Sequence, residues 1–201
     1  MQHSIPCSNW SPLTVTEVHD LFRDAPFTWG LAGGHAIERF VGRPIREHGD
    51  VDVILFRDDQ RAAHEWLAGW HLHAADPPGT LRSWTAEETL PPGVHDIWCH
   101  RRDAQAWQLQ LMLAENEGEE WFSRRNAAIR GSRREMIVEY GGLPCIRVEV
   151  QLLFKAKTNR AKDLMDLHAC LPLLSGEARA WLRAMLQVAH PEGHAWSGMI
   201  P

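Results

Sequence analysis

Residues Trp29 to Phe56 read WGLAGGHAIERFVGRPIREHGDVDVILF, and this stretch decides the fold. A short apolar segment ends at the pair Gly33-Gly34, and a helical pattern follows it. A second apolar segment then opens with Asp50 and Asp52, which are separated by one residue. This order predicts a glycine turn and a pair of carboxylates at the same end of one sheet.

The two aspartates begin a predicted strand. Val51, Val53 and Leu55 recur at every second position, which is typical of a half-buried strand. Because residues two apart on a strand point to the same face, Asp50 and Asp52 are expected to project side by side. Two carboxylates so close repel each other unless a cation or a proton lies between them. Mg²⁺ fits such a pair, since it takes hard oxygen ligands together with substrate phosphates, although a solvated acidic strand end is the alternative for this motif alone.

The glycine pair lies between a predicted strand and a predicted helix. Gly33 and Gly34 permit backbone angles that are closed to other residues and allow the main chain to approach a ligand closely. The helix that follows offers free N–H groups and a favourable dipole for phosphate. A Gly-Gly pair alone is commonly an ordinary tight turn. The whole order is more specific, because Arg46 and His48 lead from the helix into the strand of paired aspartates.

The wording GGHAIERFVGRPIREHGDVDV is similar to the small aminoglycoside and lincosamide nucleotidyltransferases, within the DNA polymerase beta-type nucleotidyltransferase superfamily. Weaker similarity extends over Trp107 to Glu115 (WQLQLMLAE) and Pro144 to Leu173. The resemblance implies transfer of a nucleotidyl group, usually AMP, from a nucleoside triphosphate to a hydroxyl. It also implies release of pyrophosphate and the use of two Mg²⁺ ions.

The resemblance also implies roles for individual residues. Asp50 and Asp52 would hold Mg²⁺ in a cleft between the sheet and a helical C-terminal part. All three lysines of the chain, against eighteen arginines, fall at Lys155, Lys157 and Lys162, and Lys155 or Lys157 would reach the phosphates. We favour Lys155. The residues expected to bind the nucleotide are Gly33, Gly34, Arg46, His48 and Lys155.

The chain departs from the family where a neighbouring strand usually supplies a third carboxylate. The corresponding segment runs from Trp107 to Leu113, and its polar face carries Gln108 and Gln110. Glutamine forms hydrogen bonds but is neither a base nor a strong metal ligand. Glu115, just past this strand, is the first candidate for the third catalytic carboxylate, and Asp96, in the preceding strand, is the second.

Composition limits the function further. The 201 residues carry a net charge of -5, which argues against general nucleic-acid binding. The sequence contains no run of 18 apolar residues, so no membrane span is predicted, and the N-terminus lacks the features of a signal peptide. The four scattered cysteines are typical of reduced thiols in a cytoplasmic protein. His71 and His73 share one face of a predicted strand, but no nearby cysteine or third histidine completes a zinc set in the sequence.

The pattern along the chain predicts an α/β (α+β) fold, with a small mixed sheet, flanking helices and a helical C-terminal part. We expect a nucleotidyltransferase core over residues 1–142 and a helical region over residues 143–201. A capping box of Thr14 and Glu17 marks the start of the first helix. The other expected elements are strands 27–32, 51–56, 70–74, 94–100 and 107–113, and helices 34–41 and 59–68.

These observations predict a Mg²⁺-dependent nucleotidyltransferase whose acceptor is a hydroxyl-bearing small molecule, such as an aminoglycoside- or lincosamide-like antibiotic. Two alternatives stay open. Gln110 suggests a catalytically degenerate protein that binds a nucleotide or a partner without turnover. The chain could equally be a module of a toxin–antitoxin system that modifies a protein or tRNA.

Overall fold

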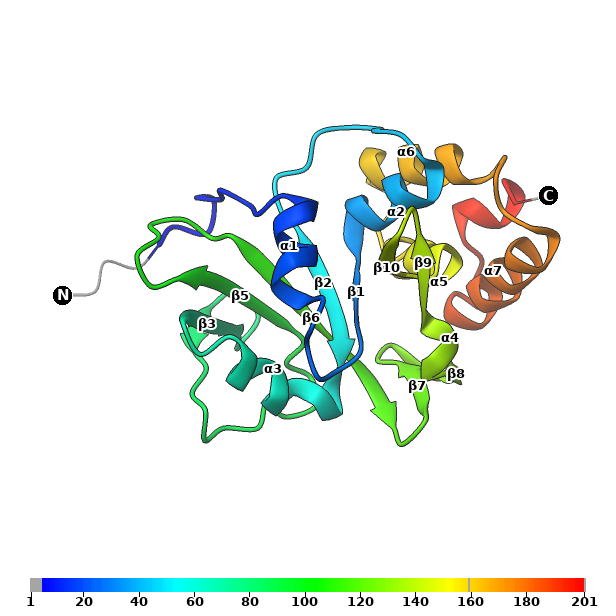
Figure 1. The fold of residues 1–201 in the computed structure, drawn as a ribbon. Helices are drawn as coiled ribbons and strands as arrows, with labels where there is room; N and C mark the ends of the chain where they lie inside the picture. Colours follow the sequence, from blue (N-terminus) through cyan, green and yellow to red (C-terminus); the bar gives the residue numbers. More distant parts are fainter. Residues whose placement is uncertain (1–4, 159, 201) are drawn as a thin grey trace.

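The computed structural model describes residues 5–158 and 160–200, and its centre is a mixed β-sheet (Figure 1). The main path of the sheet has the order β4-β3-β5-β6-β2-β1-β10-β9, and β7 and β8 form a ribbon that continues from β6. The strands are β1 (Trp29–Leu31), β2 (Asp52–Phe56), β3 (Trp70–Ala75), β4 (Leu81–Ser83), β5 (Asp96–Arg101), β6 (Leu109–Glu117), β7 (Glu120–Ser123), β8 (Asn126–Ser132), β9 (Ile137–Tyr140) and β10 (Leu143–Ile146).

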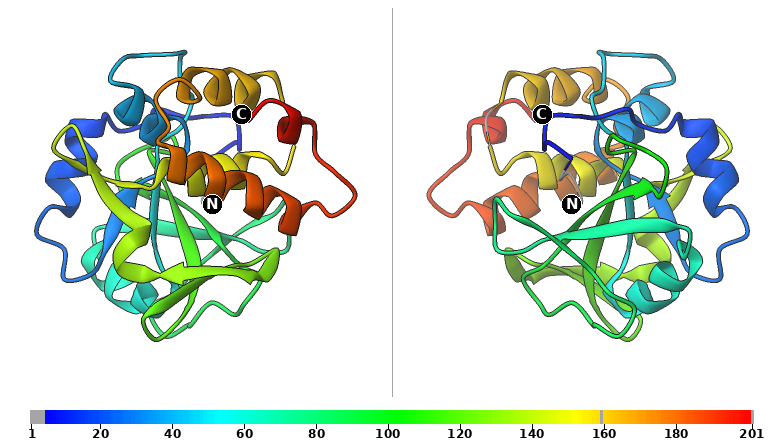
Figure 2. Two further views of the ribbon diagram at one scale, coloured as in Figure 1. Left: turned by 90° about the vertical axis from the view of Figure 1, so that its right-hand side faces the viewer. Right: turned by 90° about the vertical axis from the view of Figure 1, so that its left-hand side faces the viewer.

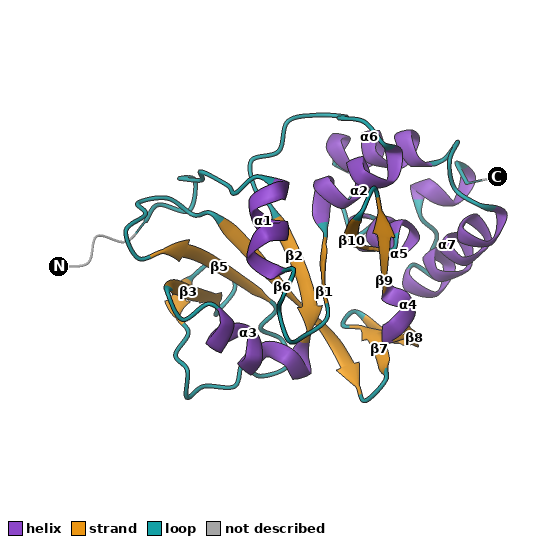
Figure 3. Ribbon diagram, viewed as in Figure 1, coloured by secondary structure: helices purple, strands orange, loops and turns teal. Residues whose placement is uncertain are grey.

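Helices cover both sides of this sheet, as Figures 2 and 3 show. One side carries α1 and α3, whereas α5 and α7 lie on the other side. The helices α2 and α6 lie near strands β1 and β10. The α-helices are α1 (Val15–Phe22), α2 (Gly33–Val41), α3 (Gln60–Trp66), α4 (Arg133–Met136), α5 (Val148–Lys155), α6 (Ala161–Cys170) and α7 (Gly176–Ala189), and the 3₁₀ helices are η1 (Arg57–Asp59) and η2 (Ala195–Gly198). No helix of the described residues is long and apolar enough to cross a membrane.

The register of the central strands decides which side chains meet. β2 runs parallel to β6, with Asp52 opposite Gln110, and β5 runs antiparallel to β6, with Asp96 opposite Met112. Neighbours in register share a face of the sheet, so Asp52, Gln110 and Asp96 all project to the same side. The other face carries buried apolar residues such as Leu111, and each such side chain stabilises the fold by about 1.5–3 kcal/mol.

Much of the predicted element order is confirmed. The capping box of α1 is present, because the Thr14 N–H donates to the Glu17 carboxylate at 2.8 Å and the Glu17 N–H donates to Thr14 Oγ1 at 3.2 Å. The mixed sheet with flanking helices is also as expected. The expected division between residues 142 and 143 falls inside the antiparallel pair of β9 and β10, and β10 also pairs with β1, so the sheet continues across it.

Two segments differ from the expectation. The loop-rich stretch after β3 contains a further short strand, β4, which pairs with the edge of β3. The basic segment from Arg124 to Tyr140, which has no clear hydrophobic period, forms β8, α4 and β9. The ribbon of β7 and β8 packs against α7, so this segment supports the C-terminal helices.

Candidate active site

A cleft of about 250 Å³ lies where the ends of β2, β5 and β6 face α5 and α6. Its charged lining has two parts. The carboxylates are Asp50, Asp52, Asp96 and Glu115, and the cations are Arg46, Arg124, Arg125, Lys155, Arg160 and Lys162. A site with both kinds of charge can hold a metal ion on one side and a polyanion on the other.

Asp50 and Asp52 enter this cleft together, in the loop before β2 and at its first residue. Burial, and after it the charge of Asp50, raises the pKa of Asp52 from 3.8 to about 7. The charge of Lys155 opposes this shift. The carboxylate of Asp52 is therefore short of positive charge at neutral pH, which is the condition in which a divalent cation is a suitable partner.

Gly33 is needed for close packing against Asp52. Its φ angle is +63°, in the left-handed region, and a Cβ atom at this position would lie 2.0 Å from Asp52 Oδ2. The Gly33 N–H donates to Gln151 Oε1 of α5 at 2.8 Å. In this structure a side-chain amide accepts this N–H, so it would have to change partner before it could bind phosphate.

Gly34 has a similar steric role on the other side of the turn. A Cβ atom here would lie 2.1 Å from His48 Cε1 and 2.7 Å from Arg46 Nη2. The absence of a side chain therefore lets the loop that follows α2 pack onto the start of the helix. Gly34 lines the cleft, and as a first-turn residue its N–H has no partner within the helix.

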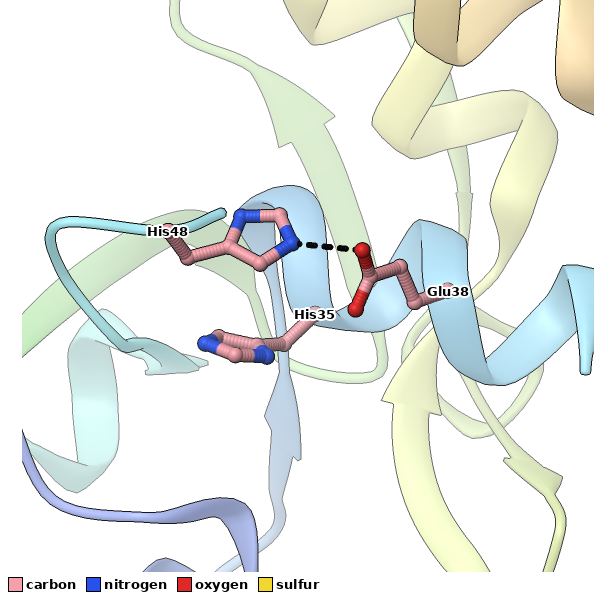
Figure 4. A group of neighbouring side chains, drawn as sticks. All are labelled: His35, Glu38 and His48. Carbon is pink, nitrogen blue, oxygen red and sulfur yellow. Dashed lines mark ion pairs between the residues drawn. The ribbon is translucent and has the colours of Figure 1, made fainter. Parts of the chain in front are cut away.

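Glu38 fastens the loop between α2 and β2 (Figure 4). One oxygen, Oε1, accepts the N–H groups of Ile45 at 2.7 Å and Arg46 at 3.2 Å and lies 2.9 Å from His48 Nε2. Arg46 Nη1 lies 3.0 Å from His48 Nδ1. The side chain of His48 is almost fully buried and does not line the cleft. The sequence analysis expected His48 to bind the nucleotide, whereas the structure places it behind the site. Arg46 does line the cleft.

His35 completes the group drawn in Figure 4, and its ring centre lies 4.3 Å from that of His48. Donor atoms of His35, Glu38 and His48 lie within 4.8 Å of one another, so the group is a formal metal candidate. The hydrogen bonds argue for a clamp instead. Arg46 can only donate to His48 Nδ1, so Nε2 carries the ring proton, and it lies 2.9 Å from Glu38 Oε1. A cation on Nε2 would have to displace this proton beside the Arg46 guanidinium.

The acidic residues of α6 arrange the cations of the cleft. Lys155 Nζ lies 2.8 Å from Asp166 and 3.6 Å from Asp163, and Arg46 also pairs with Asp166 at 3.2 Å. Lys155 therefore lies in the cleft as expected, but its charge is shared with two buried carboxylates. Lys157 is exposed and does not line the cleft.

Two further cations of the lining, Arg124 and Lys162, were not among the residues that the sequence analysis expected to bind the nucleotide. Within the described residues, neither Arg124 nor Lys162 forms an ion pair of 4 Å or less. Arg124 belongs to the basic segment that follows β7, and the fold places it on the wall of the cleft.

Glu115 lines the cleft, but its carboxylate is bound to Arg57. Arg57 Nε and Nη2 donate to the two carboxylate oxygens at 2.6 Å each, and His95 Nδ1 lies 3.2 Å from Oε1. Gln110 is the residue of β6 that lies opposite Asp52. Glu115 lies five residues further along β6, which is about 16 Å from Gln110 along the strand. This position and this ion pair contradict the expectation that Glu115 supplies the third carboxylate beside Asp50 and Asp52.

Asp96 occupies the place that Glu115 was expected to fill. It begins β5, lines the cleft and accepts a 3.4 Å hydrogen bond from Gln110 Nε2. Its charge contributes to the raised pKa of Asp52, so the two carboxylates are electrostatic neighbours. The geometry therefore groups Asp50, Asp52 and Asp96, with Gln110 between the two strands.

Comparison with known proteins gives a matching family and solved structures of similar fold. A family model described as aminoglycoside-2''-adenylyltransferase matches residues 14–169. The lincomycin-bound crystal structure of the lincosamide antibiotic adenylyltransferase LnuA has 18% identity and a TM-score of 0.53, over 80% of this chain and 96% of that chain. The solution structure of the antibiotic-resistance factor ANT(2'')-Ia has 16% identity and a TM-score of 0.57, over 89% and 93%.

A crystal structure of ANT(2'')-Ia in complex with adenylyl-2''-tobramycin is also similar, with 14% identity and a TM-score of 0.52, over 85% of this chain and 95% of that chain. No curated protein sequence matches the chain. The likeness to these solved structures shows the fold, and the family model shows the family.

Gly34→Ala is expected to destabilise the protein by about 1–3 kcal/mol, because the new methyl group overlaps the His48 ring and the Arg46 guanidinium. Gly49→Ala, in the loop that packs onto Gly34, is the matched control, since its Cβ would have no neighbour within 4 Å and its φ is not positive. Urea denaturation of both variants gives the comparison. Equal unfolding midpoints for the two variants would show that Gly34 is not held in this packing.

Glu115→Gln is expected to lower the free energy of unfolding by about 3 kcal/mol or more, because it leaves the Arg57 guanidinium buried without its charged partner. Glu65→Gln is the control, since Glu65 forms an exposed ion pair with Arg61 that contributes about 0.5 kcal/mol or less. Urea denaturation measures both. A Glu115→Gln variant as stable as the wild type would return Glu115 to the list of catalytic candidates.

Proposed function

The chain belongs to the aminoglycoside-2''-adenylyltransferase family and is thus a nucleotidyltransferase, and we propose that it transfers AMP from ATP to a hydroxyl group of an antibiotic of the aminoglycoside or lincosamide type. The observation that carries this proposal is the grouping of Asp50, Asp52 and Asp96 in a cleft whose opposite wall is cationic. Two of the similar structures are complexes with lincomycin and with adenylyl-2''-tobramycin, which supports this class of acceptor.

The paired carboxylates fit Mg²⁺. Asp50 and Asp52 are crowded enough that burial and mutual repulsion raise the pKa of Asp52 to about 7, and a divalent cation would relieve both effects. In the proposed site these two residues hold the metal, which would neutralise charge on the attacking and leaving oxygens. Their fixed position at the start of β2 aligns the triphosphate for in-line attack.

Asp96 is the proposed acceptor of the hydroxyl proton. Its carboxylate shares the face of Asp52, and Gln110 holds it by a side-chain hydrogen bond. As the acceptor oxygen forms its bond to the α-phosphorus, the bond to pyrophosphate breaks and the proton passes to a carboxylate oxygen of Asp96. A neutral Gln110 beside Asp52 suits this arrangement, because a fourth carboxylate would add repulsion that the site must neutralise.

The leaving pyrophosphate needs positive charge. Arg124 and Lys162 line the cleft, and we propose that they contact the phosphates together with the N–H of Gly34 at the start of α2. Lys155 and Arg46 also line the cleft, although the Asp166 carboxylate neutralises part of their charge.

All four cysteines are free thiols, which supports a reducing, cytoplasmic location for the reaction.

Asp52→Asn tests the metal proposal without an activity assay. The native pKa of about 7 lies above the ordinary 3.8, so the native state holds its proton at higher pH than the unfolded chain. The metal-free wild type is therefore expected to lose stability relative to Asp52→Asn as the pH rises from 4 to about 7. At pH 8, Mg²⁺ should raise the melting temperature of the wild type and leave that of Asp52→Asn unchanged.

Asp103→Asn is the control for this experiment, because Asp103 is an exposed aspartate outside the cleft. It should follow the wild type at each pH, with and without Mg²⁺. A Mg²⁺ effect that survives in Asp52→Asn would contradict the assignment of the metal to this pair.

An acceptor screen tests the reaction itself. The protein is incubated with Mg²⁺, one of ATP, GTP, CTP and UTP, and a panel of aminoglycosides and lincosamides, and products are detected by mass. We expect a product heavier by one AMP unit with ATP. If no combination of nucleotide and acceptor gave a product, the catalytically degenerate alternative would be favoured. If the added nucleotide unit were found on tRNA or on a protein instead, the toxin–antitoxin alternative would be favoured.

With a substrate in hand, Asp96→Asn is expected to lower turnover by about 10²–10⁴-fold, the usual contribution of a general base, with nucleotide affinity nearly unchanged. Glu115→Gln, assayed at a temperature where it is folded, should lower turnover far less. The reverse order of the two effects would falsify the assignment of Asp96.

A further inference from the structure

Three histidines outside the active site meet on one face of the sheet. β3 runs antiparallel to β5, with His71 directly opposite His100 and His73 opposite Trp98. His73 lies two residues from His71, so all three imidazoles project to the same side. The sequence contains the His71–His73 pair, but only the pairing of β3 with β5 brings the third histidine to it.

The spacing of the rings matches a metal site. The ring centre of His100 lies 5.0 Å from that of His71 and 5.8 Å from that of His73. In a tetrahedral zinc site with Zn–N bonds of about 2.0–2.1 Å, the centres of two liganding imidazoles lie about 5 Å apart. His71 and His73 are separated by about 6.6 Å of strand, which their side chains can bridge.

The hydrogen bonding of His100 prepares it to bind a metal. Its Nδ1 lies 2.9 Å from the backbone oxygen of Arg101, which can only accept, so the proton is on Nδ1 and the lone pair is on Nε2. Histidines that bind metals usually donate their other ring N–H to such an acceptor. Burial lowers the pKa of His73 and of His100, which favours the neutral form of the ring that a metal requires.

Tryptophan forms the apolar wall beside these rings. The indole of Trp107 contacts His73 and His100 edge to face, at 5.2 and 5.3 Å between ring centres. His71 and His73 are only partly buried, so an ion can reach the group from solvent. Among the described residues, the only group of three potential ligands whose donor atoms already lie within 4.8 Å of one another is the one drawn in Figure 4. Metal binding by His71, His73 and His100 therefore requires their rings to turn about the side-chain torsions.

We propose that His71, His73 and His100 form a three-histidine site for Zn²⁺ or a similar borderline divalent cation, with a fourth position for water or another ligand. This site is distinct from the catalytic carboxylates. His100 lies four residues from Asp96 along β5, which is about 13 Å. The nitrogen donors favour a transition metal over Mg²⁺, which selects oxygen.

The test is a calorimetric titration of the chelator-treated, dialysed protein with Zn²⁺, in the presence of millimolar Mg²⁺ to occupy the carboxylates. We expect one equivalent to bind with an affinity above that of the other histidines. A parallel titration with Co²⁺ should give the intense visible absorption of a tetrahedral ion and quench part of the intrinsic tryptophan fluorescence, since Trp107 lies beside the rings. His71→Asn, His73→Asn and His100→Gln should each weaken binding by at least tenfold.

His35→Gln and His48→Gln are the matched controls, because these histidines belong to the other cluster and should leave binding unchanged. Circular dichroism confirms that each variant is folded, and His71→Asn keeps the test valid if a buried change disturbs the fold, because His71 is partly exposed. The proposal is overturned if no stoichiometric site is found, if binding survives in His71→Asn, or if only the controls abolish it.

Discussion

The half-buried carboxylate of Asp52 is the constraint on which the rest of the site depends. It stands at the first residue of β2, within reach of Asp50 and Asp96, and its raised pKa records the cost of placing negative charge there. The neighbouring elements accommodate this charge. Gly33 has no side chain where Asp52 needs space, Gln110 is neutral in register with it, and Lys155 supplies a counter-charge.

A second layer of buried charge holds the first in place. Asp163 and Asp166 of α6 are fully buried and fix Lys155 and Arg46 from behind. On the opposite wall, Arg57 donates to Glu115 and to the carbonyls of Leu90, Pro91 and Val94, so it ties the loop before β5 to β6. Each of these groups is expensive to bury alone, and the pairs are therefore sensitive to loss of either partner.

Sequence reasoning reached the parts of this arrangement that depend on local spacing. The capping box of Thr14 and the shared face of Asp50 and Asp52 follow from periods of four residues or fewer. The choice between Glu115 and Asp96 does not, because it rests on the register of β5 against β6 and on Arg57, which lies far from Glu115 in the chain. His48 was misplaced for a similar reason, since only the folded loop turns it toward Glu38.

The hydrogen bond from Gly33 to Gln151 has a consequence for the order of events. Gln151 belongs to α5, whereas Gly33 begins α2, so one bond joins the turn beneath the carboxylates to the C-terminal helices. A single N–H in this geometry serves one strong acceptor at a time. If a phosphate oxygen were to take it, the amide of Gln151 would have to withdraw, and substrate entry would then be an exchange of partners at the junction of α2 and α5 instead of the simple filling of a space.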